Sequence, residues 1–127
     1  MEEDTFDERF RMGVGLINRK EFFEAHDVLE DLWNETHGEL RLFLQGMIQA
    51  AVGCYHLSNG NTTGAISQYQ KSLDKLTKYP DDYMGIDLSS FREGLERCYA
   101  GACLMAEKDA RYEVDPVYFP EVRFISS

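Results

Sequence analysis

A run of about twenty residues, from Glu39 to Ser58, limits the fold of this chain more than any other feature. The helix that this run predicts is apolar on almost every side, with Leu40, Leu42, Phe43, Leu44, Met47, Ile48, Ala50, Ala51, Val52, Cys54, Tyr55 and Leu57. A helix of this kind must be covered by its neighbours. Its longest apolar run, near Phe43 to Leu57, is broken by Gln45, Gln49 and His56, so that run is too short and too polar to span a membrane. We therefore predict a central, buried helix.

Four further segments show helical spacing of apolar residues, with short connections between them. They run from a cap at Asp4 or Thr5 to about Ile17, from about Glu21 to Glu35, and from about Thr62 to Lys78. The last one starts at a cap at Asp87, or at a capping box of Ser90 with Glu93, and ends at Lys108. Short connections favour antiparallel neighbours, and no strand-and-crossover pattern appears. The sequence predicts an all-α fold with a single domain over residues 1–127. We expect a bundle of about five antiparallel helices over about residues 5–110.

The last segment, residues 111–127, reads RYEVDPVYFPEVRFISS. Its two prolines prevent it from being helical throughout. It is also too apolar for a free disordered tail. We expect an extended C-terminal tail that packs against the bundle or against a second subunit.

The chain is acidic, with 23 acidic against 13 basic residues and a formal net charge of −10. This balance argues against binding to nucleic acid or to anionic membrane surfaces, which both require cationic side chains. The N-terminal MEEDTFDERF lacks the apolar region of a signal peptide. Cys54, Cys98 and Cys103 form no close pair of the kind that binds zinc, so free buried thiols are predicted. These features predict a soluble cytoplasmic protein.

Two polar residues fall within the apolar arc of the helix predicted at residues 21–35. At about 100° per residue, His26 lies between Phe22 and Phe23, and Glu30 lies beside Phe23. Their four-residue spacing lets the imidazole and the carboxylate touch. An unpaired carboxylate is unfavourable in an apolar setting. We therefore expect both side chains to be largely buried and bonded to each other or to the central helix.

The central helix offers partners for this pair. Gln45, Gln49 and His56 share a strip about 40° wide at about 100° per residue. If that strip faces the helix at residues 21–35, the bundle interior holds two imidazoles, a carboxylate and two amides, and Trp33 either forms a wall of the pocket or packs in the core. The candidate ligand-binding residues are His26, Glu30, Trp33, Gln45, Gln49 and His56.

Several functions remain open for this cluster. His26, Glu30 and His56 could hold a divalent metal ion, or could perform acid–base chemistry such as hydrolysis. The cluster could also be an internal hydrogen-bond network, or the strip could be the solvent-facing side of the central helix. The sequence thus supports a domain that binds an unidentified small molecule or metal. The alternative is a non-catalytic helical module for protein–protein interaction.

We also predict a homodimer. Five helices in a small domain leave apolar surface uncovered, and large exposed apolar patches mark interfaces. The tail adds Val117, Tyr118, Phe119, Val122, Phe124 and Ile125 to that surface. Salt screens the repulsion between exposed charges beyond about 8–10 Å, so the dimer should persist or tighten as salt rises.

The motifs together resemble the DUF309 family. The first block runs from Gly13 through Asn18 and continues with FFEAH, Leu29-Glu30 and Trp33. Second and third blocks are formed by Phe43-Leu44-Gln45-Gly46, Ile48-Gln49-Ala50, His56, Gly60-Asn61 and Gly64-Ala65, and then by Gly85-Ile86-Asp87. The resemblance covers roughly residues 6–105. It implies the all-α fold of small prokaryotic and plastid proteins, without an established reaction.

Two positions depart from the family pattern. Lys20 stands where the family usually has a glycine, which implies a different turn between the first two helices. Asn34 stands where an arginine commonly follows the tryptophan. The second departure removes a cation from the neighbourhood of the candidate site.

Overall fold

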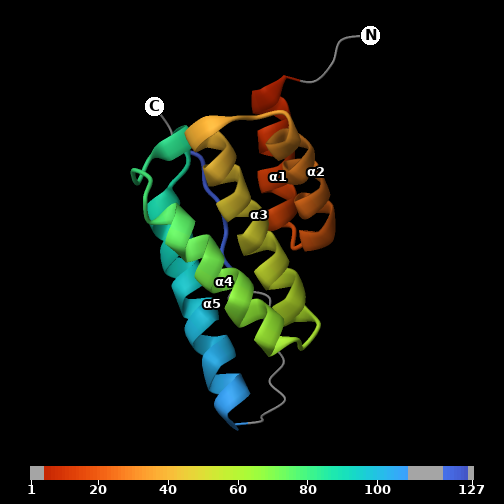
Figure 1. Ribbon diagram of the computed structural model, residues 1–127, viewed down its shortest axis with the longest axis vertical. Coiled ribbons are helices and arrows are strands. Elements are labelled where there is room, and N and C mark those ends of the chain that lie inside the picture. The colour runs from red at the N-terminus through yellow and green to blue at the C-terminus, as the bar shows by residue number, and fades with distance from the viewer. Residues whose placement is uncertain (1–4, 109–118, 126–127) are drawn as a thin grey trace.

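The computed structural model describes residues 5–108 and 119–125 (Figure 1). In this part of the chain there are five α-helices, each antiparallel to the next and packed against it. They are α1 (Phe6–Asn18), α2 (Phe22–Asn34), α3 (Gly38–Ser58), α4 (Thr62–Leu76) and α5 (Leu88–Lys108). A short 3₁₀ helix, η1 (Tyr83–Gly85), precedes α5. The predicted all-α bundle is confirmed.

The first helix begins with a capping box. The Thr5 hydroxyl accepts from the Glu8 amide at 3.2 Å, and the Glu8 carboxylate accepts from the Thr5 amide at 3.4 Å. Both amides would otherwise lack a partner at the helix start. The turn from α1 to α2 then passes through Lys20 with φ of 63°. Glycine adopts this left-handed conformation most easily, which explains why a glycine suits the position better than a lysine.

The central helix α3 lies between α2 and α4 (Figure 1). Its contact with α4 is close because glycines face that helix. A Cβ atom at Gly46 would lie 2.9 Å from Leu76 Cδ2, and one at Gly53 would lie 2.7 Å from Tyr69 Cδ1. The Ser72 hydroxyl donates to the Gly46 carbonyl across this contact at 2.7 Å. Small residues therefore fix the distance between α3 and α4.

The fifth helix is held at its start and against α4. The Asp87 carboxylate accepts from the Ser90 amide at 3.1 Å, and this hydrogen bond lowers the pKa of Asp87. The Arg92 guanidinium donates to the carbonyls of Leu76 and Tyr79 and pairs with Asp81. Arg92 thus satisfies carbonyls left open where α4 ends.

Residues 119–125 pack against the bundle. The Asn18 side chain donates to the Val122 carbonyl at 2.8 Å and accepts from the Val122 amide at 2.7 Å. The rings of Phe119 and Phe22 lie 5.0 Å apart, and Phe124 forms a single antiparallel bridge with Ile86. The expected packing of the tail against the bundle is confirmed for these residues. Residues 109–118 lie outside the described part.

The core lies between α3 and the other helices. Cys54 and Cys98 are buried and Cys103 is partly buried, and none of the three forms a disulfide. The Tyr69 hydroxyl donates to Cys54 Sγ at 3.2 Å, and burial raises the pKa of both groups. Both groups therefore stay protonated at neutral pH. In the described residues, no helix is long and apolar enough to cross a membrane.

Candidate functional site

The buried face of α2 differs from the apolar arc expected from the sequence. It consists of Phe22, Ala25, Leu29 and Leu32. Phe23, which was expected on that face, exposes 53% of its surface. At about 100° per residue, Phe23, His26, Glu30 and Trp33 form a second strip, about 100° from the buried face. The sequence pattern therefore merged a buried face with a neighbouring, more exposed one.

His26 and Glu30 are bonded to each other on this second strip. His26 Nε2 lies 2.8 Å from Glu30 Oε2, and His26 Nδ1 lies 3.3 Å from Asp27 Oδ1. The predicted contact between the two side chains is confirmed. The predicted burial is wrong for Glu30, whose side chain is 48% exposed, whereas His26 is partly buried, with 29% of its side chain exposed. Solvent reaches the carboxylate, so it needs no internal partner.

The polar strip of α3 faces away from the core. Gln45, Gln49 and His56 are partly buried, whereas Phe43, Met47 and Cys54 on the opposite side of the helix are fully buried. By the same spacing of about 100° per residue, Arg41 and Val52 belong to this strip as well. The strip thus lies on the outer side of α3, as one of the interpretations of the sequence had it.

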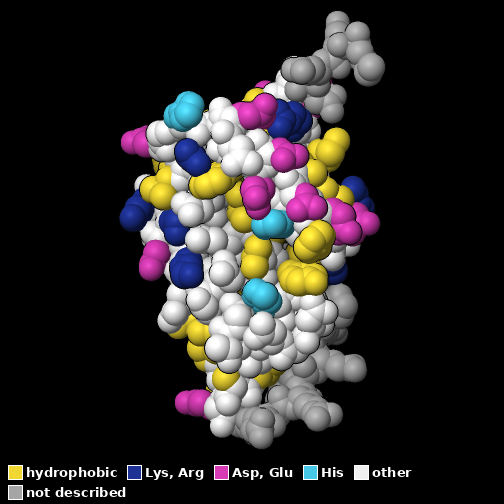
Figure 2. Space-filling model, turned by 45° about the vertical axis from the view of Figure 1, so that its right-hand side comes forward, with side chains coloured by type: hydrophobic (Ala, Val, Ile, Leu, Met, Phe, Trp, Pro, Cys, Tyr) yellow, Lys and Arg dark blue, Asp and Glu magenta, His cyan; other side chains and the backbone are white. Residues whose placement is uncertain are grey.

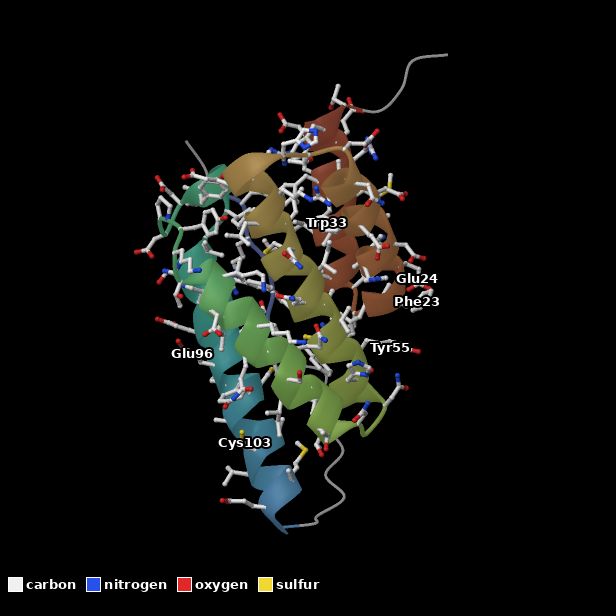
Figure 3. The ribbon with its side chains drawn as sticks, in the orientation of Figure 1. Phe23, Glu24, Trp33, Tyr55, Glu96 and Cys103 are labelled. Atoms are coloured by element: carbon white, nitrogen blue, oxygen red, sulfur yellow. The ribbon has the colours of Figure 1, made fainter. Side chains whose placement is uncertain are left out.

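Two side-chain contacts, one near each end, connect the strips of α2 and α3. The rings of Phe23 and Tyr55 lie 5.8 Å apart at one end, and the Arg41 guanidinium lies 4.0 Å from the centre of the Trp33 ring at the other. Figure 3 shows Phe23 and Tyr55 close together and Trp33 further along the same pair of helices. Because α2 and α3 are antiparallel, His26 and Glu30 lie between these ends, opposite the segment with Gln45 and Gln49.

We call this surface the α2–α3 strip. It consists of Phe23, His26, Glu30 and Trp33 from α2, and of Arg41, Gln45, Gln49, Val52, Tyr55 and His56 from α3. Figure 2 shows hydrophobic, histidine and acidic side chains side by side on one face of the molecule. All six predicted site residues belong to the strip. The strip also contains Phe23, Arg41, Val52 and Tyr55, which were not among the predicted site residues, although the helical spacing from Gln45 indicates Arg41 and Val52.

The expected metal ligands do not form one cluster. His56 Nδ1 lies 3.3 Å from the side-chain Nδ2 of Asn61, and its ring lies beside Tyr55. Within residues 5–108 and 119–125, no group of three or more His, Cys, Asp or Glu residues is placed to hold a metal ion. Divalent metal binding by His26, Glu30 and His56 stays a prediction.

Two buried polar atoms on the strip have no hydrogen-bond partner among the described residues. They are the Trp33 indole Nε1 and the Gln49 side-chain Oε1. A buried donor or acceptor without a partner costs about 1–3 kcal/mol. Such atoms mark a place where a small rearrangement toward a bound group would gain free energy.

The comparisons with known proteins agree with the resemblance read from the sequence. Residues 10–68 match the family model described as "Domain of unknown function (DUF309)". An "Uncharacterized protein" of Aquifex aeolicus is 29% identical over 80 residues, which are 62% of this chain and 24% of that protein. The "Uncharacterized protein YpuF" of Bacillus subtilis is 40% identical over 47 residues, 36% of this chain and 27% of that protein.

The present chain therefore spans about a quarter of the length of these two relatives. The matched region runs from α1 into α4 and contains the whole α2–α3 strip. The third block of the resemblance, at Gly85-Ile86-Asp87, lies beyond it and stays a resemblance. Residues 10–68 of this chain are therefore similar to the DUF309 family, whose function its description leaves unknown.

Proposed function

We propose that this protein is a non-catalytic helical module that binds another protein through the α2–α3 strip. The observation that carries this proposal is the pair of Phe23 and Tyr55, two aromatic rings in contact that stay 53% and 39% exposed. Burying apolar surface stabilises a complex by about 25 cal/mol per Å². The pair therefore offers a binding partner a ready apolar contact.

The surroundings of the pair support an interface. Trp33, Tyr55 and Arg41 belong to the residue types that carry most of the binding energy in protein interfaces. The polar side chains of His26, Gln45 and Gln49 lie on the same strip and are only partly buried. An apolar centre with a polar rim is the usual composition of such a surface. The contacts of His26 with Glu30 and Asp27 also orient its ring before a partner arrives.

A small-molecule or divalent-metal site is the second candidate, with hydrolysis as its catalytic form. The unpartnered Gln49 Oε1 favours it, because this acceptor could bind a donor of a ligand. Metal analysis of the purified protein and titration with divalent ions test this candidate. Stoichiometric binding that His26→Ala or His56→Ala abolishes would support it over the protein-binding module.

Site-specific crosslinking in cells tests the protein-binding module. A photoreactive amino acid replaces Phe23 or Tyr55 in the full chain, and Leu104 on α5 serves as the exposed apolar control. We expect the same partner protein to be crosslinked from both positions of the strip and not from Leu104. Equal crosslinking from the control, or none from the strip, would contradict the proposal.

Homodimerisation is a related proposal, and the structure changes which residues could carry it. Phe119 and Val122 are buried against their own chain, so they are not free for an interface between subunits. Phe23, Tyr55 and Leu104 are among the most exposed apolar side chains of the described part. Crosslinking of the strip to a second copy of this chain, with a dimer in sedimentation, would identify the strip as the dimer interface instead.

A further inference from the structure

We propose that the segment bound by the α2–α3 strip is a cationic amphipathic helix of about three turns. This inference depends on the function proposed above and adds the charge, the length and the secondary structure of the bound segment. Each of the three follows from a separate property of the strip and its surroundings.

The charge of the bound segment follows from the carboxylates along α2. Glu24, Asp27, Glu30 and Asp31 are all exposed on α2. In the described part of the chain, no lysine or arginine forms an ion pair with any of them, and His26 is the partner of Asp27 and Glu30. A partner with lysine or arginine at its edges would be complementary to this surface, and the net charge of −10 would speed its approach.

The same charges disfavour two other occupants. A second copy of the chain would bring its own acidic α2 helix against this one, and opposed carboxylates weaken association. An anionic partner, such as an acidic peptide, would meet the same repulsion. A second copy, an anionic partner and a cationic partner could all make the apolar contact with the rings. The neighbouring carboxylates favour the cationic partner.

The length follows from the spacing of the aromatic side chains. Phe23 and Trp33 are ten residues apart on α2, which corresponds to about 15 Å along the helix axis. A partner helix of about eleven residues, or three turns, reaches both ends of the strip. Its apolar residues would recur at every third or fourth position, so that one side of it contacts Phe23, Tyr55 and Trp33.

The helical conformation follows from the backbone of the strip. The surface consists of two α-helices, whose backbone groups already bond within each helix. It offers no strand edge to which an extended peptide could add. In a bound helix, the backbone N–H and C=O groups form hydrogen bonds within the helix, so the strip needs to supply only side-chain contacts.

Binding of designed peptides tests the inference. The probe is a stabilised helix of about eleven residues with apolar residues on one side and lysines on the rest, and it contains no tryptophan. Trp33 is the only tryptophan of the chain, so its fluorescence reports binding at the strip. One comparison peptide carries glutamates in place of the lysines, and another has the same composition without an apolar side.

We expect the lysine peptide to bind at least about tenfold more tightly than either comparison peptide. Its affinity should fall as salt rises, because screening weakens contacts between exposed charges. Equal binding of the lysine and glutamate peptides, or no binding of the lysine peptide at any salt concentration, would overturn the inference.

Two matched charge reversals locate the contact. Glu24 and Glu96 are both exposed glutamates, but Glu24 lies beside Phe23 on α2, whereas Glu96 lies on α5 at the other side of the bundle (Figure 3). Glu24→Lys should weaken binding of the lysine peptide about three- to tenfold, and Glu96→Lys should leave it unchanged. Equal effects of the two variants would mean that only the net charge matters, and would contradict docking on the strip.

The crosslinking experiment tests the proposed function, and the peptide experiment tests the class of partner, so the two claims can be contradicted separately. If the strip crosslinks one partner protein but the contacted segment is acidic or extended, the partner class is wrong and the module remains. If neither position of the strip crosslinks a partner, the proposed function is wrong whatever the peptides do.

Discussion

The two faces of the α2–α3 pair are built in different ways. The inner face is apolar and closed, with Phe22, Leu29, Phe43 and Met47 almost without contact to solvent. The outer face alternates aromatic and polar side chains, and most of them are only partly covered. The comparison is sharpest at two adjacent residues, since Phe22 is 3% exposed and Phe23 is 53% exposed.

The α3–α4 contact and the outer face of the α2–α3 pair also differ in whether their buried polar groups have hydrogen-bond partners. Where α3 meets α4, the buried hydroxyls of Ser72 and Tyr69 both have partners, at Gly46 and Cys54. On the outer face, Trp33 Nε1 and Gln49 Oε1 are buried and have no hydrogen-bond partner in the part of the chain that the structure describes. The closed contacts therefore stabilise the fold, while the outer face of the α2–α3 pair retains apolar and polar groups that a partner can use.

The largest effect is expected from truncating the two phenylalanines separately. Phe22→Ala removes a buried ring that packs on Phe119, and should lower the free energy of unfolding by about 3–5 kcal/mol. Phe23→Ala should lower it by less than about 1 kcal/mol, because its ring is largely exposed. Chemical denaturation of both variants measures the difference. Similar losses would show that Phe23 belongs to the core.

A smaller effect is expected from Asn18, whose side chain holds residues 119–125 against the bundle. Asn18→Ala removes both hydrogen bonds to the Val122 backbone and should lower the free energy of unfolding by about 1–3 kcal/mol. Amide exchange at Val122 should also become faster. Asn59→Ala is the matched control, because its side chain bonds an exposed helix end and its loss should have little effect. Unchanged exchange at Val122 would contradict this role of Asn18.

The sequence predicts the helices well, because their spacing, caps and connections are local signals. Thr5 and Asp87 mark helix starts, and the apolar pattern of α3 identifies the central helix. The site was predicted less completely. The six candidate residues fall on one strip of the surface, but the sequence pattern places them in the interior because it counts Phe23 as core.

The reason for this error is physical. A ring such as Phe23 has the same hydrophobicity whether it packs inside or stays exposed for a partner, so an apolar pattern alone does not separate the two cases. The contact between Arg41 and Trp33 depends on the register of two helices, which the sequence of either helix does not contain. Tertiary packing decides both.

A smaller effect is expected at the turn that leads into α2. Lys20→Gly should raise the free energy of unfolding by about 0.5–1 kcal/mol, since glycine adopts the observed φ of 63° without strain. Arg19→Gly is the control, because Arg19 has φ of −85° and gains nothing from glycine. Thermal and chemical denaturation compare the two. A loss of stability in Lys20→Gly would contradict strain at this turn.

The smallest effect on stability is expected from the pair of His26 and Glu30. Their contact is partly exposed, and contacts of this kind contribute about 0.2–1 kcal/mol. The double variant His26→Gln with Glu30→Gln should therefore change the free energy of unfolding by less than about 1 kcal/mol. A change of several kcal/mol would show that the pair supports the fold, as expected for a buried network.

The most direct test of the outer face as a binding surface measures binding and stability in the same variants. The partner protein identified by crosslinking is titrated against the unchanged chain, Phe23→Ala and Leu104→Ala, and each variant is also unfolded with denaturant. We predict at least about tenfold weaker binding for Phe23→Ala, with both variants nearly as stable as the unchanged chain. Equal binding by the two folded variants would contradict the assignment of the α2–α3 strip as the binding surface.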